Sequence, residues 1–209
     1  MKLRIRIVIN FILALSVLLV WGYMFLGSES FLSSPGLTSL KYFTVLSNIF
    51  AGVTSALWAI VAIKGKDTKA VDILKFVSTV AVMITFSVVL FFLRPVYKDV
   101  PMYSGANLGF HLLIPLAELI EFVIFNKTKI SIKERLFAGI PAFLYGAVYL
   151  LNIGINGKGE WPDTNDWYGF LNWGLPIGMV IFFGIVLVSI LLGFLIIGIL
   201  KIRDKITGN

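Results

Sequence analysis

The chain has 209 residues, of which 58% are hydrophobic, and its formal net charge is +7. A mean hydropathy of +0.94 is well above that of a soluble domain and indicates a helical membrane protein with several spans. The lack of cysteine excludes disulfides, cysteine nucleophiles and thiolate metal sites, and the single histidine excludes a multi-histidine metal site.

Six apolar runs follow one another along the chain, and each is long enough to supply the roughly 20 helical residues that cross a bilayer. They cover approximately residues 5–26, 42–63, 73–93, 106–125, 136–152 and 170–200. None alternates strictly between apolar and polar residues, so a β-barrel is not expected. We predict an all-α integral membrane protein, with six transmembrane helices in a single domain over residues 1–209.

The first run has an alternative interpretation as a cleaved signal peptide, with Leu26-Gly27-Ser28 as a weak cleavage site. The run is longer than the apolar part of a typical signal peptide. Its loss would also break the charge pattern of the remaining loops. We therefore expect an uncleaved first helix.

Basic residues alternate between the two sides of the predicted bundle. Fourteen of the 18 fall on the side of the termini. These are Lys2, Arg4, Arg6, Lys64, Lys66, Lys69, Lys75, Lys127, Lys129, Lys133, Arg135, Lys201, Arg203 and Lys205. The positive-inside rule then predicts cytoplasmic N and C termini, and it explains the net charge without a nucleic-acid partner. The expected location is a plasma membrane, bacterial in origin.

The second run begins with KYFTVLSN, which places Thr44, Ser47 and Asn48 just inside the apolar segment. At helical spacing these residues share one face with Ala51 and Ser55. Small and hydroxylated residues commonly pack transmembrane helices together, and we adopt that reading for Ala51 and Ser55. Thr44 lies about 5 Å below the helix entrance and is a candidate nucleophile.

The only histidine, His111, lies just inside the fourth run at a similar depth below the outer surface. Pro115 and Glu118 share its helix face, and Pro115 cannot bond to the carbonyl of His111. Glu118 lies about 10 Å deeper, too far to orient the imidazole, and would form the floor of a pocket or pair with another helix. The structural alternative is a histidine that only bonds to a neighbouring helix.

An imidazole that accepts the proton of a threonine hydroxyl turns the hydroxyl into a nucleophile. Free amide groups at the start of the second helix are candidate donors to an oxyanion. The residue that orients His111 stays open among five outer polar residues. These are Asn48, Asn152, Asp163, Asp166 and Asn172. Such chemistry needs neither a metal nor an organic cofactor.

The outer loops offer further supporting residues. Arg94 ends the third run and either extends its side chain to the interface or holds a lipid carboxylate or phosphate. Trp161, Trp167 and Trp173 crowd the loop before the last run. We favour an interfacial aromatic belt for them. The alternative is that WPDTNDWYGF folds over the outer mouth as a lid.

These motifs resemble a known family. KYFTVLSN, the lone histidine in NLGFHLLIPLAELIEF and the aromatic outer loop are similar to the androgen-induced (androgen-dependent) membrane threonine hydrolases, whose bacterial relatives are called Pr6Pr-type proteins. The resemblance covers about residues 10–200. It implies cleavage of fatty acid esters of hydroxy fatty acids, with the family's threonine and histidine at Thr44 and His111.

The sequence thus predicts an intramembrane lipid ester hydrolase whose site opens toward the outer leaflet. Its partners would be the bilayer and a fatty acyl ester substrate. A small transporter is the first alternative; against it, we find no inverted repeat, and the polar residues concentrate in the outer half rather than lining a full pathway. A lipid-binding protein without catalysis is the second.

Overall fold

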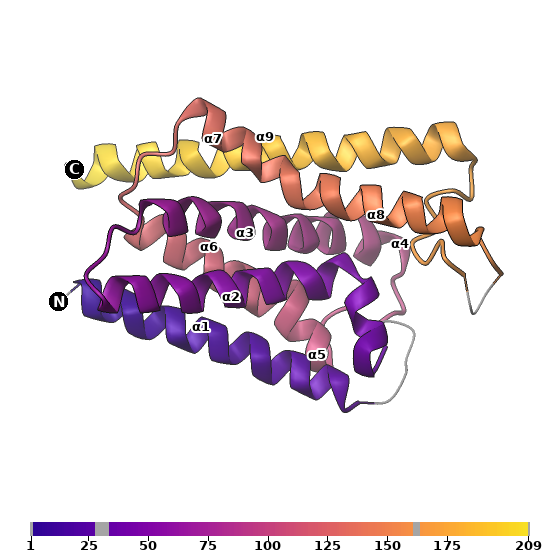
Figure 1. Cartoon of the computed structure of the whole chain (residues 1–209), viewed down its shortest axis with the longest axis horizontal. Coiled ribbons are helices and arrows are strands. Elements are labelled where there is room, and N and C mark those ends of the chain that lie inside the picture. The colour runs from indigo at the N-terminus through magenta and orange to yellow at the C-terminus, as the bar shows by residue number, and fades with distance from the viewer. Residues whose placement is uncertain (1, 28–33, 161–163, 209) are drawn as a thin grey trace.

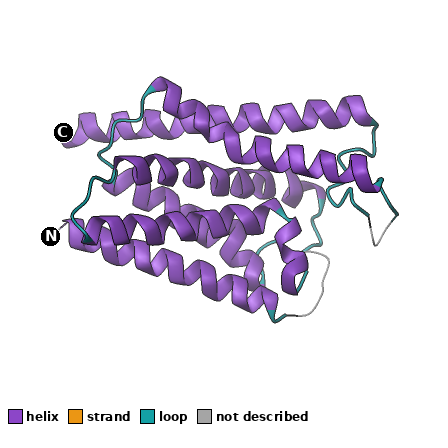
Figure 2. Cartoon of the chain, in the orientation of Figure 1, coloured by secondary structure: helices purple, strands orange, loops and turns teal. Residues whose placement is uncertain are grey.

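The computed structural model describes residues 2–27, 34–160 and 164–208, and the described residues are helical with connecting loops and no strands (Figure 2). Within them, six helical segments are long and apolar enough to cross a membrane. Their bounds are Lys2–Phe25, Phe43–Ile63, Lys69–Val96, Gly105–Phe125, Ile132–Asn156 and Leu175–Thr207. The predicted all-α membrane fold is confirmed. The last helix begins at Leu175 rather than near Phe170.

Three of these segments are uninterrupted α-helices, and three are built from shorter pieces. The uninterrupted ones are α1 (Lys2–Phe25), α2 (Phe43–Ile63) and α9 (Leu175–Thr207). The third consists of α3 (Lys69–Val88), η2 (Val89–Leu93) and α4 (Arg94–Val96). The fourth consists of α5 (Gly105–Leu108), η3 (Gly109–Leu113) and α6 (Ile114–Phe125), and the fifth of α7 (Ile132–Leu136), η4 (Phe137–Gly139) and α8 (Ile140–Asn156). A 3₁₀ segment, η1 (Gly36–Lys41), precedes α2.

Helix α3 is the centre of the bundle. It contacts α2, α6, α8 and α9, while α1 packs along α2 and α6 (Figure 1). Helices α8 and α9 form a pair on one side, and the two described chain ends lie at the same end of the bundle (Figure 1). Six described spans, an even number, bring the two chain ends to the same side, as the sequence predicts.

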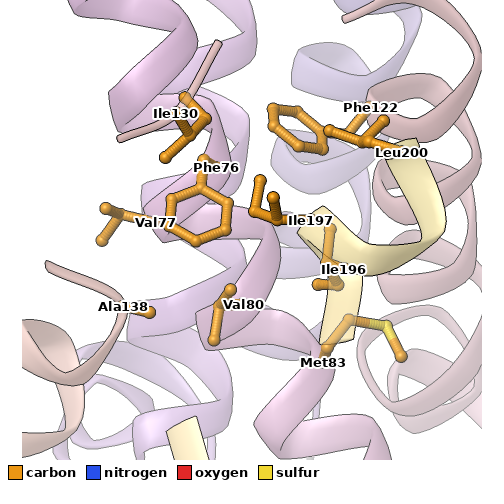
Figure 3. Close-up of a cluster of buried hydrophobic side chains, with 10 residues drawn as sticks. All are labelled: Phe76, Val77, Val80, Met83, Phe122, Ile130, Ala138, Ile196, Ile197 and Leu200. Atoms are coloured by element: carbon orange, nitrogen blue, oxygen red, sulfur yellow. The ribbon is translucent and has the colours of Figure 1, made fainter. Parts of the chain in front are cut away.

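A compact apolar cluster joins α3, α6 and α9 (Figure 3). Phe76 and Phe122, both fully buried, pack with ring centroids 6.0 Å apart, and Ile196 and Ile197 of α9 lie against them. In a bilayer such contacts are stabilised by close packing rather than by exclusion of water, because lipid tails are as apolar as the side chains. The cluster ties the long last helix to the centre of the bundle.

Two π-helical segments, η2 and η3, interrupt the third and fourth spans, and each is followed by a proline two residues after its end, Pro95 and Pro115. Proline lacks an amide hydrogen, so a carbonyl in the preceding turn loses its usual partner and the helix adjusts its register. Segment η3 contains His111. The sequence therefore predicted the irregularity at Pro115, and the structure places the histidine inside it.

Two of the basic residues assigned from sequence to the ends of helices are instead inside the bundle. Lys75 is fully buried in α3, and Arg6 of α1 is 6% exposed. Both form ion pairs with buried carboxylates. The sequence reading was wrong here because a hydropathy profile places charges at span ends. Within a bundle, a buried acidic partner can hold them deeper.

Candidate functional site

Thr44 lies in the first turn of α2 and is half-buried. Its hydroxyl makes no side-chain hydrogen bond to any other described residue. The two neighbouring polar side chains on the same helix are hydrogen-bonded. Ser47 and Asn48 both donate to the carbonyl oxygen of Thr44, at 3.1 and 2.8 Å. Thr44 therefore differs from its neighbours in keeping a free hydroxyl.

The first amide groups of α2 are mostly occupied. The amide of Phe43 donates to the Tyr168 hydroxyl at 2.9 Å, and those of Val45 and Leu46 donate to the carbonyl of Tyr42. Within the described part of the chain, the amide of Thr44 has no such partner. Of the amide groups expected to stabilise an oxyanion, one is therefore available in this first turn. It is the main-chain amide of Thr44, the candidate nucleophile itself.

His111 is buried in η3, and its Nδ1 lies 2.9 Å from the main-chain oxygen of Met102. A carbonyl can only accept a hydrogen bond, so Nδ1 carries a proton, and in the neutral imidazole Nε2 then keeps its lone pair. This is the tautomer that a general base needs, with Nε2 as the proton acceptor. Sequence reasoning missed Met102 because a main-chain partner in a loop leaves no signal in residue type.

Asn48 joins the two elements that carry the candidate pair. It is fully buried, and its Nδ2 donates both to the carbonyl of Thr44 and, at 3.2 Å, to the carbonyl of Phe110, which directly precedes His111. The second and fourth spans therefore contact each other at this depth, which the sequence alone could not show. The amide oxygen of Asn48 is buried without a hydrogen bond.

The other candidates for orienting His111 have different partners. Asp166 accepts from the Tyr149 hydroxyl and from the amide of Leu171, and Asn152 donates to Asn165. Asn172 accepts from Lys158. Asp163 lies outside the described residues. These contacts organise the outer loop, and the Met102 carbonyl takes the role that the sequence left open.

An apolar groove of about 570 Å³ runs beside α2, between α3 and α8. Its walls include Ser47, Phe50, Leu46 and Val148, and its outer end carries Lys41. Leu46 and Val148 are exposed at the rim, so the groove is open sideways, toward the lipid. The volume falls in the range of small-molecule pockets. Ser47 lines this groove, whereas Thr44 and His111 do not.

The described part of the outer loop packs over the start of α2. Trp167 donates to the Tyr145 hydroxyl at 3.0 Å and also lines the groove, while Tyr168 stacks on Phe170. Burial raises the pKa of the Tyr168 hydroxyl well above its usual value, so this group stays neutral beside the Phe43 amide. Trp167 therefore contacts the groove and Tyr168 contacts the start of α2, while the lid hypothesis stays a prediction and Trp161 lies outside the described residues.

Two of the expected supporting residues lie at the surface. Trp173 is 66% exposed, which fits the interfacial aromatic belt. The exposed Arg94 has its guanidinium 5.6 Å from the ring centroid of Tyr103, in the loop that also contains Met102. Neither residue lines the groove.

Glu118 belongs to a second polar centre, deeper in the bundle. It is fully buried and accepts from Ser55 at 2.6 Å and from Lys75 at 2.5 Å. Of the two roles expected for Glu118, pairing with another helix is confirmed. Ser55 was expected only to pack helices together. Its hydroxyl also donates to Glu118 and accepts from Lys75, so it links these two side chains.

The remaining members of this centre were not singled out from the sequence as functional residues. They are Arg6, Asn10, Asp72, Lys75 and Glu121. The spacing of these residues in the sequence could have found them. Asp72 lies three residues before Lys75, and Glu118 lies three residues before Glu121, so each pair shares one helix face. Acidic residues inside a span are costly unless paired and so point to a shared partner.

No protein-family model, curated protein or solved structure was found to match the chain. The family resemblance drawn from the short motifs thus stays a prediction.

Proposed function

We propose that the chain is an intramembrane lipid ester hydrolase with Thr44 as nucleophile and His111 as general base. The observation that carries the proposal is the bond from His111 Nδ1 to Met102, which leaves Nε2 as a base. Thr44 lies on α2, which contacts η3, and its hydroxyl and amide are both free of partners among the described residues. Asn48 holds the two elements together.

In the proposed reaction, the Thr44 oxygen attacks the ester carbonyl while its proton passes to His111 Nε2. The amide of Thr44 stabilises the developing oxyanion, and the alcohol leaves with the proton from the imidazole. Water then attacks the acyl-threonine while His111 accepts its proton, and the imidazole returns this proton to the Thr44 oxygen as the fatty acid is released. The substrate would be a long-chain fatty acyl ester, such as a fatty acid ester of a hydroxy fatty acid, and its chain would lie in the apolar groove.

The topology is part of the proposal. The two charges found in the interior leave twelve basic residues on the side of the termini, all at least partly exposed, against four at the other end. This asymmetry supports cytoplasmic termini and a site in the outer leaflet. A plasma membrane, bacterial in origin, is the proposed location.

Turnover of long-chain acyl esters by the purified protein in nanodiscs tests the proposal. Thr44→Val keeps the shape of the side chain and removes the hydroxyl, whereas Thr44→Ser keeps a hydroxyl. We expect Thr44→Val and His111→Ala each to lower kcat by at least about 100-fold, and Thr44→Ser to retain activity. Folded Thr44→Val and His111→Ala proteins with full turnover would show that the assignment is wrong.

One observation favours transport as a second candidate. Hydroxyl pairs between α2 and α3, Ser47 with Thr85 at 3.1 Å and Thr54 with Ser78 at 2.8 Å, continue inward from the outer site. Ser55 and Lys75 extend this row toward the end of the termini. The expectation that polar residues concentrate in the outer half is therefore wrong. Solute flux into proteoliposomes, retained in Thr44→Val, would favour the transporter.

A further inference from the structure

The second polar centre holds five ionisable side chains at almost complete burial. Arg6 and Lys75 are the bases, and Asp72, Glu118 and Glu121 are the acids, each 6% exposed or less. They come from α1, α3 and α6, and the neighbouring groups from α2, Ser55 and Trp58, are not ionisable. With every group ionised, the cluster would carry one uncompensated negative charge inside the bundle.

The carboxylate oxygens of the three acids accept different numbers of hydrogen bonds. Asp72 accepts from Trp58, Thr68 and Thr128 and contacts Arg6 at 3.1 Å. Both oxygens of Glu118 also accept hydrogen bonds, from Ser55 and Lys75.

Glu121 is the exception. Its Oε1 accepts from Arg6 at 2.7 Å and from Asn10 at 2.8 Å, but its Oε2 has no hydrogen bond and only a 3.4 Å contact to Lys75. A second buried oxygen, Oδ1 of Asn10, is also without a hydrogen bond. Asn10 is fully buried and already touches Glu121. A proton on Glu121 Oε2 would turn this unsatisfied acceptor into a hydrogen-bond donor.

From the charge imbalance and the two unsatisfied oxygens, we propose that this cluster is a proton-binding site, in which the carboxyl groups of Glu118 and Glu121 share one exchangeable proton across Lys75. The pair titrates as a unit, because both carboxyl groups face the same ammonium group. The bound proton removes the excess charge, whose burial would otherwise be costly.

The site has a link to water at the end of the bundle where the termini lie. Asp72 is bonded to the hydroxyls of Thr68 and Thr128, which belong to two loops there and are only half-buried. Arg6 connects Asp72 to Glu121. Proton exchange is therefore expected with the aqueous phase on that side. The inference is independent of whether Thr44 is a nucleophile.

Infrared spectroscopy of the full-length protein in nanodiscs tests the proposal through the carbonyl stretch of a protonated carboxylic acid. At neutral pH we expect such a band in the wild type, shifted by transfer to D₂O. Glu118→Gln and Glu121→Gln each leave two acids and two bases in the cluster. Its charges then balance without a bound proton, so either variant should lose the band. Glu160→Gln, at an exposed outer position, is the control and should keep it.

Three results would overturn the proposal. They are a wild type without the band, a band that persists in both glutamine variants, and a band that does not shift in D₂O. The wild-type spectra need no variant, so a missing band or a missing shift in D₂O overturns the proposal even where a glutamine variant fails to fold.

Discussion

The Nδ1 atom of His111 lies 2.9 Å from the main-chain oxygen of Met102, nine residues earlier in the chain. The bond ties the π-helical segment η3 to the loop that precedes α5 and fixes which imidazole nitrogen is basic. In serine hydrolases a carboxylate usually orients the histidine. Here a carbonyl does so without adding a buried charge.

The tautomer of His111 can be measured directly, because the chain has one histidine. Nitrogen-15 labelling of histidine therefore gives the signals of this residue alone. In mildly alkaline buffer we expect a protonated Nδ1 and an unprotonated Nε2. The reverse assignment would contradict the bond to Met102 and remove the base from the proposed reaction.

Gly109 allows α1 and η3 to approach closely. A Cβ at this position would lie 2.8 Å from both γ-carbons of Val20. We expect Gly109→Ala to lower the free energy of unfolding by about 1–3 kcal/mol, measured by thermal or denaturant unfolding in detergent. Adding Val20→Ala should restore part of the loss.

Gly198, in the last third of α9, is the matched control for this change. It has no atom within 4 Å of a built Cβ, so Gly198→Ala should be neutral or slightly stabilising. Equal destabilisation by the two glycine substitutions would show that the contact with Val20 is not the cause.

Removing Lys75 would leave three buried acids with one base. We expect Lys75→Met to destabilise the bundle by about 3–5 kcal/mol, because it leaves buried carboxylates unpaired. The double variant Lys75→Met/Glu118→Gln should recover part of this loss, as a double-mutant cycle would measure. Strict additivity of the two changes would argue against a direct interaction.

Filling the groove should discriminate between substrates by chain length. Val148→Trp places a bulky ring on the groove wall, and we expect kcat/KM to fall about tenfold for long-chain esters and little for short-chain ones. Val180→Trp, at an exposed position on α9 outside the groove, is the control. Equal loss for both chain lengths would place the acyl chain elsewhere.

The helices could be predicted from the sequence because each span is a nearly unbroken apolar run with polar boundaries. The depths expected for Thr44 and His111 rest on helical rise alone and stay a prediction. Met102 could not be found in this way, since any residue can supply a carbonyl. The ion cluster was misassigned because Arg6 and Lys75 lie near span ends in sequence. Only the packing of α1, α3 and α6 brings their acidic partners to them.

The central claim is that Thr44 carries an activated hydroxyl. Labelling of the purified, lipid-supplied protein with a fluorophosphonate, followed by mass spectrometry of its peptides, tests it most directly. The account predicts one adduct on Thr44 that disappears in Thr44→Val and is greatly reduced in His111→Ala. An adduct on another side chain, or a folded wild-type protein that forms none, would contradict it.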